Sequence, residues 1–416
     1  MCMKRIINTC IAILLWLIGT AQEVPVFTLD SIMVRIQAGN PSLQTFALRA
    51  ESYRYSAEAA TAWMAPMVGV GTFMTPYPGQ KDVMDGDRGS LMLRFEQTIP
   101  GRAKQQAKKD YILSQAAAEQ LGKDVLYNDY RAKARSLYHS WVINKKRLLI
   151  LDESNRLMET MKKMEEVRVP YGQGSIANVY KAEARIEENN NMAVMYRGEI
   201  AKSRAYLNSL MNLPGDLVFD IDEQVFPAPL PSVTDTLQLA ISRKDIARMD
   251  ANIQSMQMGI RSMELERRPD FRVAFDHMQP LGRTMPYAFS VMGMISVPIV
   301  PWARKMYKNE VKAMEYNISA MQMERSAMLT ETRSMLFGMQ AEIRSMEQRI
   351  TNLETKIIPV VQRAFDLSYI GYQDNRAPIA TVLSDWEALV MMKMNVLDER
   401  QKLFEMMVNY EKELYQ

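Results

Sequence analysis

The segment Ile99-Pro100-Gly101-Arg102-Ala103-Lys104 has a counterpart 201 residues later, Val300-Pro301-Trp302-Ala303-Arg304-Lys305. Before each segment, apolar and polar residues alternate as they do in a β-strand. After each segment the pattern becomes helical and stays so for about 65 residues. Two such junctions predict that the chain carries two copies of one structural plan.

Further matched segments follow in the same order, at offsets near 201 to 204 residues. They are Leu29-Asp30-Ser31-Ile32 with the segment from Val233 to Leu237, Pro66 with Pro269, and the helix break Tyr171 to Ile176 with the segment from Tyr369 to Ile379. Each copy is expected to run helix, strand, strand, long helix, helix. We therefore predict a first structural repeat at residues 22–212, a proline-rich linker at 213–231 and a second repeat at 232–416.

The first 21 residues have the pattern of a secretory signal peptide. Lys4 and Arg5 precede the apolar run Ile11 to Ile18, and small residues up to Ala21 follow it. The alternative, an N-terminal membrane anchor, needs a longer apolar run. Both cysteines of the chain fall inside this segment, so the mature chain is expected to have neither disulfides nor thiolate metal sites. The net charge of +3 gives no electrostatic case for binding nucleic acid.

Period-two alternation predicts two strands in each copy. Phe271, Val273 and Phe275 form one apolar face, as do Leu91 and Leu93 in the first copy. Four strands cannot close into a barrel, and lipid does not tolerate open sheet edges. Either the strands pack on a soluble core, or several chains pool them. Pooling is favoured because no other segment is shaped to cover a sheet, and three chains with four strands each would supply twelve.

The helical runs at residues 102–168 and 303–367 are each expected to form one rod about 100 Å long, at ~1.5 Å per residue. In the second run, apolar residues recur every seven positions, with one slip of four residues. The repeating positions are Met314, Met321, Met328 and Met335, then Met339, Met346, Leu353, Val360 and Leu367, with Ile343, Ile350, Ile357 and Ala364 between them. This pattern predicts a coiled-coil seam with a stutter.

An internally duplicated chain with two strands and two long hairpin helices in each copy resembles the TolC-like outer-membrane efflux protein family. The resemblance covers essentially the whole mature chain. It implies a mainly α fold with a small β part, completed as a homotrimer with a 12-strand β-barrel in the outer membrane. Coiled-coil α-barrel helices would extend into the periplasm. It also implies two partners, a periplasmic adaptor protein and an inner-membrane pump, expected to be of the RND type.

The same resemblance places the helix breaks at the periplasmic tips, where the adaptor would bind. The residues assigned to the tips are Tyr171, Gly172, Gln173, Gly174, Tyr369 and Gly371. Gly172 and Gly174 are expected to adopt positive φ in a tight turn, and Tyr171 or Gln173 could contact the adaptor.

Related tunnels narrow at the tips partly through acidic rings, which makes Asp366 and Asp374 candidates for a gate. Here they are not a pair one turn apart, so the alternative, two solvated carboxylates near a helix end, stays open.

Methionine is unusually frequent, with 35 residues in the chain. Thioether sulfur suits Cu(I) and Ag(I), but methionine also replaces leucine in helical seams. Most of the Met-x-Met pairs are poor chelators, since residues two apart do not share a helix face. These pairs are Met256/Met258, Met292/Met294, Met321/Met323 and Met392/Met394. Only Met292 and Met294, on a strand, could converge.

No catalytic, cofactor-binding or metal site is predicted from the remaining residues. His139 and His277 lie far apart in the repeat plan and are expected to have structural or surface roles. The sequence therefore favours a non-enzymatic channel that passively conducts drugs or heavy-metal ions such as Cu(I) or Ag(I) from the periplasm to the exterior, driven by the inner-membrane pump. The alternative is a periplasmic coiled-coil adaptor or structural protein of an envelope transport complex.

Overall fold

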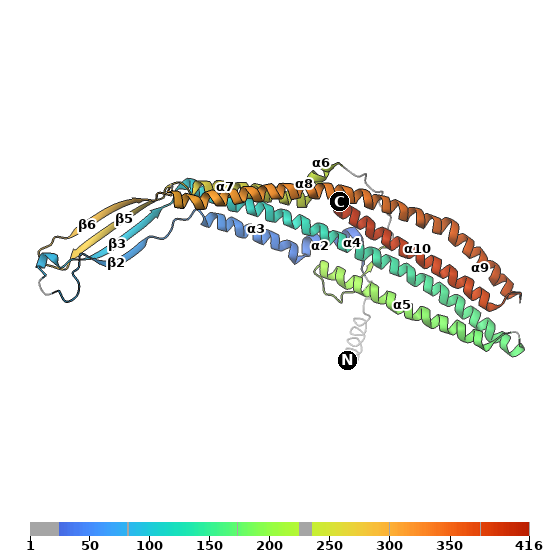
Figure 1. Ribbon diagram of the computed structural model, residues 1–416. Coiled ribbons are helices and arrows are strands. Elements are labelled where there is room, and N and C mark those ends of the chain that lie inside the picture. Colours follow the sequence, from blue (N-terminus) through green and yellow to red (C-terminus); the bar gives the residue numbers. More distant parts are fainter. Residues whose placement is uncertain are drawn as a thin grey trace, which may run out of the picture.

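The computed structural model shows an elongated molecule with a β-sheet at one end and long helices over the rest (Figure 1). It describes residues 25–80, 83–172, 174–223, 235–298, 300–374 and 376–415. The expected signal peptide, residues 1–21, lies outside the described residues. The helices and strands confirm the predicted fold class, mainly α with a small β part.

The two halves repeat one order of elements, with α8 and α9 of the second half in the place of the single helix α4 of the first. The first half consists of α2 (Leu29–Gly39), α3 (Pro41–Ala59), β2 (Met67–Phe73), β3 (Ser90–Ile99), α4 (Arg102–Arg168) and α5 (Ile176–Leu210). The second consists of α6 (Thr236–Ser242), α7 (Lys244–Leu265), β5 (Phe271–Pro280), β6 (Ala288–Ile295), α8 (Pro301–Asn352), α9 (Ile358–Gln373) and α10 (Ile379–Leu414). Polar side chains cap the first helix of each half, because the Thr28 and Asp235 oxygens accept backbone N–H groups at 3.3 Å and 2.7 Å.

The four long strands form one antiparallel sheet in the order β2-β3-β5-β6, so the hairpins of the two halves pair through β3 and β5. Its register places Phe95 opposite Phe275 and Arg94 opposite Asp276. A second, two-stranded sheet was not predicted. There β1 (Val26–Phe27) runs parallel to β4 (Asp220–Ile221), a strand within the expected linker.

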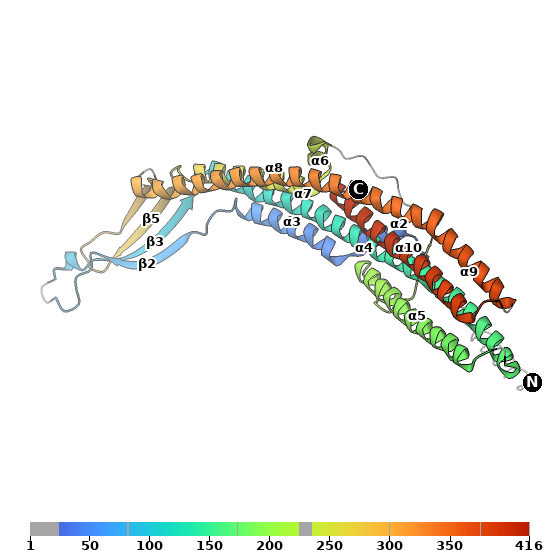
Figure 2. The same cartoon turned by 45° about the vertical axis from the view of Figure 1, so that its right-hand side comes forward.

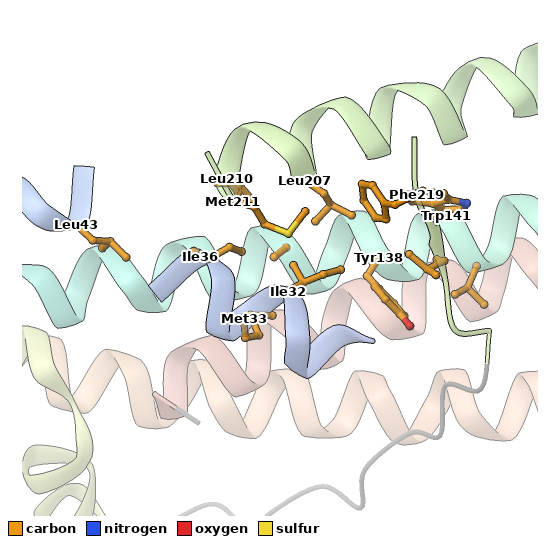
Figure 3. Packing of buried hydrophobic residues seen from close by; sticks show 13 residues of the cluster. Ile32, Met33, Ile36, Leu43, Tyr138, Trp141, Leu207, Leu210, Met211 and Phe219 are labelled. Atoms are coloured by element: carbon orange, nitrogen blue, oxygen red, sulfur yellow. The ribbon is translucent and has the colours of Figure 1, made fainter. Parts of the chain in front are cut away.

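The largest buried ring of the helical part lies where this small sheet meets the shaft. Trp141 of α4 contacts Phe219, with ring centroids 5.2 Å apart, and Phe27 stacks on Phe219 at 4.9 Å. Ile32 of α2 and Leu207 of α5 belong to the same buried cluster (Figure 3). The chain before β4 is thus tied to the middle of the molecule by aromatic packing.

The second rod is not the continuous α-helix that the sequence predicted. A π-helical turn at Leu353–Ile357 separates α8 from α9, and Pro359 follows in the first turn of α9. Proline lacks the backbone N–H that donates the hydrogen bond of an α-helix. The prediction of a continuous rod did not take this proline into account. A π-turn inserts one extra residue into the helix.

That extra residue shifts the apolar seam by one position. From Ile343 to Leu353 the predicted positions are buried, but Val360 and Leu367 are exposed. Earlier in the helix the predicted Met335 is exposed, and Leu336 beside it is buried instead. Val361 and Phe365 pack into the core in place of Val360 and Ala364. The heptad extrapolated beyond residue 353 was therefore wrong by one residue.

In the part of the chain that the structure describes, no helix combines the length and the apolar character needed to cross a lipid bilayer.

Candidate functional site

The two helical hairpins end side by side at the end of the molecule opposite the sheet (Figures 1 and 2). The first tip joins α4 to α5, and the second joins α9 to α10. Arg168 of the first hairpin donates hydrogen bonds from Nη2 to the carbonyl oxygens of Tyr372 and Gln373, at 3.1 Å and 3.4 Å. The resemblance placed both breaks at one end, and the structure brings them into contact.

A buried carboxylate holds the two tips together. Glu165, in the last turn of α4, is 2% exposed. Its Oε1 accepts a hydrogen bond of 2.7 Å from the Tyr372 hydroxyl of the second hairpin. Its Oε2 accepts from the Ser175 N–H and from Asn178 Nδ2, both at 3.2 Å. One side chain thus links α4, the start of α5 and the end of α9.

Tyr372 remains a hydrogen-bond donor at any physiological pH. Burial raises the pKa of Tyr372, and the hydrogen bond to the Glu165 carboxylate raises it further. The Arg168 guanidinium lies over the tyrosine ring, 4.3 Å from its centroid, and adds a cation–π contact. The three side chains form a charge-assisted cluster, which we call the tip cluster: Glu165, Arg168 and Tyr372.

A cavity of about 560 Å³ adjoins the tip cluster. Arg376 and Pro378 of the second tip line it together with Glu165 and Asn178. The polar groups at the tips therefore border open space.

The predicted turn glycines behave differently from each other. Gly172 has φ +68°, which confirms the positive φ expected for it. Gly174 does not share that conformation. A Cβ atom at Gly174 would lie 3.0 Å from Arg168 Cβ and 3.1 Å from the Glu165 carbonyl oxygen. The positive φ expected at Gly174 was therefore wrong. A glycine is needed at this position because the backbone packs too closely for a side chain. Gln173 lies outside the described residues.

The tyrosines of the two tips also differ. Tyr171 is exposed, whereas Tyr369 is half-buried and stacks on Phe365 at 5.7 Å. Gly371 contributes its carbonyl, which accepts the N–H groups of Arg376 and Ala377 at 2.7 Å and 3.1 Å. Contact between these tip residues and an adaptor stays a prediction.

The two gate candidates lie on the surface of the protomer, outside the tip cluster. Asp366 accepts a hydrogen bond of 2.8 Å from Gln362 on its own helix. Asp374 is exposed where α9 ends, and its backbone N–H donates to Ile370 O. Their role as a gate stays a prediction.

Sequence reasoning missed Glu165 and Tyr372. Glu165 is one of many charged residues on α4 and carries no motif. The signal that the sequence offered was the position of Glu165, about two helical turns before a Tyr-Gly break. Its partner lies 207 residues away, so their pairing depends on the packing of the two hairpins.

At the opposite end, the sheet has two chemically different faces. One face carries Leu93, Phe95, Phe275 and Phe289, and all four are exposed, Phe289 to 71%. The other carries charged pairs. Arg94 donates to both carboxylate oxygens of Asp276, at 2.7 Å and 3.1 Å, and Arg272 pairs with Glu96 at 2.8 Å. Successive side chains of a strand point to opposite faces, so the apolar and the charged side chains each lie on their own face of the sheet.

The two histidines lie far apart, as expected. His139 stacks on Phe404 at 4.6 Å, and burial together with nearby Arg135 lowers the pKa of His139 to about 4. His277, on β5, stacks on Tyr287 at 6.5 Å. Over the described ranges of the chain, no three His, Cys, Asp or Glu side chains are placed to share a metal ion.

Comparison with known proteins gives a match only at the level of structure. No protein-family model and no curated protein matches the sequence. The solved structure of CusC is similar to the chain with a TM-score of 0.74 and 14% identity over 93% of this chain and 91% of that one. The open state of the MtrE outer membrane channel of Neisseria gonorrhoeae gives a TM-score of 0.71 and 15% identity, over 93% of this chain and 88% of that one.

A third solved structure, the CmeC outer membrane channel of Campylobacter jejuni, gives a TM-score of 0.72 with 11% identity, over 93% of this chain and 85% of that one. Similarity over nearly the full length of both chains covers the sheet, the shaft and the tips together. The chain therefore has the TolC-like fold of outer-membrane channels.

Proposed function

We propose that the chain is one protomer of a homotrimeric outer-membrane channel in a tripartite efflux system. The channel would conduct substrates passively from the periplasm to the exterior, and an inner-membrane pump would supply the energy. The protein performs no chemistry in this proposal. The shared fold supports it, and the two faces of the sheet give it a physical basis.

The observation that carries the proposal is the exposed apolar face of the sheet. Leu93, Phe95, Phe275 and Phe289 would be costly to leave in water, and all four are exposed among the described residues. In lipid, the same face is favourable and the charged face must line water. The outer strands β2 and β6 each pair on one side only within the described chain. If three such sheets were joined edge to edge, every strand would pair on both sides and the closed sheet would have twelve strands.

The rival proposal, a periplasmic adaptor or structural coiled coil, needs its strands to pack on a soluble β-domain. The exposed face formed by Phe95, Phe275 and Phe289 has no such cover within the described residues. This observation favours the channel.

The helical shaft would cross the periplasm, with the tips facing the adaptor and the inner-membrane pump, proposed to be of the RND type. Tyr171 is exposed at the first tip and is the most accessible aromatic group there. The tip cluster would hold the two hairpins of each protomer together, so that this end of the channel is narrow at rest. Breaking the Glu165–Tyr372 hydrogen bond would let the hairpins separate.

The proposal is tested by isolating the protein from outer-membrane fractions in detergent. We expect heat-modifiable trimers on electrophoresis and discrete conductance steps in planar lipid bilayers. A monomer that stays folded in water without detergent and gives no conductance would refute it.

The substrate class is proposed as drugs or heavy-metal ions, and loss of the gene separates the two. Sensitivity to copper and silver salts alone identifies metal efflux. Sensitivity to dyes and detergents alone identifies drug efflux.

A further inference from the structure

Helices α5 and α10 both pack against α4 along the helical shaft (Figures 1 and 2). Residues of α4, α5 and α10 line a groove there. Both flanking helices start at the tips and run in the same direction along the shaft. The groove encloses a cavity of about 370 Å³. Three methionines line it, Met192 from α5 and Met391 and Met394 from α10.

An ion pair sets the register of the two flanking helices. Arg185 of α5 donates from Nε to Glu387 Oε1 of α10 at 3.1 Å. Seven residues further along each helix, which is about two turns, come Met192 and Met394. The two thioethers therefore lie at the same level, on the sides of the helices that face the groove. Met391 lies three residues before Met394 and shares its helix face.

The floor of the groove is polar and already satisfied. Ser154 of α4 accepts hydrogen bonds of 3.0 Å from both Trp386 Nε1 and Asn189 Nδ2. These groups, together with the Arg185–Glu387 pair, are engaged with one another. The sulfur atoms of the three methionines are the soft potential ligands in the groove.

These methionines are not core residues. Met192 is 37% exposed and Met391 is 59% exposed, so packing within the protomer does not account for them. Thioether sulfur is a soft ligand that selects monovalent copper and similar ions over hard cations. It also needs no deprotonation, so protons do not compete for the site.

We propose that Met192, Met391 and Met394 bind one soft monovalent cation, Cu(I) or Ag(I), in the groove between α5 and α10. Met394 is the only member of the four Met-x-Met pairs that belongs to this site. The site stands apart from the proposed channel function. A metal could bind there whether or not the channel conducts it.

Methionine oxidation mapping tests the site on the full-length protein in detergent. Hydrogen peroxide converts accessible methionines to sulfoxides, and peptide mass spectrometry reports each residue separately. One equivalent of silver nitrate per protomer, in chloride-free buffer, should slow oxidation of Met192, Met391 and Met394 severalfold. Met195, 55% exposed on the same helix but outside the cavity, and Met323, 74% exposed on α8, should oxidise at unchanged rates.

The triple variant M192L/M391L/M394L replaces the sulfurs with side chains of similar volume, so the fold should be kept. It should lose the tightest equivalent of bound silver in a titration, whereas M323L should retain it. Equal protection of all exposed methionines in the wild-type protein, or no protection, would overturn the site. Because the oxidation pattern is read on the wild type, a triple variant that misfolds leaves the test intact. Trimer formation and conductance are scored separately and test only the channel proposal.

Discussion

The two ends of this molecule treat polarity in opposite ways. At the sheet end, Phe95 and Phe275 lie opposite each other on an exposed face, and the Arg94–Asp276 pair lies on the other. At the tip end, apolar side chains are buried and enclose one carboxylate, Glu165. The first arrangement suits a surface that meets lipid, and the second suits a joint held by a few strong polar contacts.

The difference teaches that one repeated sequence plan can supply an exposed apolar sheet face at one end and a hydrogen-bonded contact between hairpins at the other. An apolar outer face resists displacement from lipid, because moving it into water is costly over its whole area. A charge-assisted hydrogen bond is strong but local, so a change at one atom releases it. Four substitution experiments can break or sharpen this comparison.

The largest effect is expected from a charge on the apolar face of the sheet. Leu93→Arg should block membrane assembly, since an arginine facing lipid near the midplane costs about 2–4 kcal/mol in each protomer. Met92→Arg introduces the same charge at the adjacent residue, which points to the polar face. We expect that variant to assemble. Trimer yield from the outer-membrane fraction measures both, and similar yields would contradict the assignment of the faces.

Removing the carboxylate from the tip cluster should have the next largest effect. Glu165→Gln loses charge-assisted hydrogen bonds worth about 1.5–3 kcal/mol, so the channel should be open more often, by tenfold or more. Tyr372→Phe should act in the same direction, as it removes the 2.7 Å bond alone.

The matched control for this pair is Glu166→Gln, which changes the exposed neighbouring carboxylate. Single-channel recordings in planar bilayers measure the open fraction of each variant. If Glu166→Gln opened the channel as much as Glu165→Gln, the hydrogen bonds of the tip cluster could not be the cause.

Between the two ends, His139 gives the shaft a pH-dependent stability. Its pKa is lowered from 6.5 to about 4 in the folded state, so the unfolded chain takes up the proton first as the pH falls. Stability that is complete above pH 6.5 should decline until about pH 4, by on the order of 3 kcal/mol, and then level off. Thermal unfolding at pH 7 and pH 4.5 measures the loss. His139→Phe should reduce it.

The smallest effect is expected at the turn of the first tip. Gly172→Ala forces a Cβ into the left-handed region and should cost about 1 kcal/mol, although nothing lies within 4 Å of that atom. Gly172→Asn should cost less, because asparagine tolerates positive φ. Hydrogen exchange at the tip measures the change. An alanine variant as protected as the wild type would show that the turn carries no strain.

Features that depend on local patterns could be predicted from the sequence. The alternation of Phe271, Val273 and Phe275 predicted a strand, and Pro100 and Pro301 marked the starts of the long helices. Gly172 was predicted from turn chemistry alone. Each of these depends on residues close together in the chain.

Features that depend on contacts between distant segments could not be predicted. The Glu165–Tyr372 bond and the cavity that both Met192 and Met394 line arise only when two hairpins pack side by side. The heptad seam failed beyond Leu353 because the π-turn inserts one residue, which a fixed seven-residue repeat cannot register. Asp366 and Asp374 were chosen by analogy, and both lie on the surface of the isolated protomer.

The central claim is that three chains complete one pore around a shared axis. Electron microscopy of the purified protein in lipid nanodiscs tests it most directly. The account predicts a particle with three-fold symmetry, its sheets joined within the lipid disc and its helices projecting about 100 Å from it. A monomer whose sheet lies outside the disc would contradict the account.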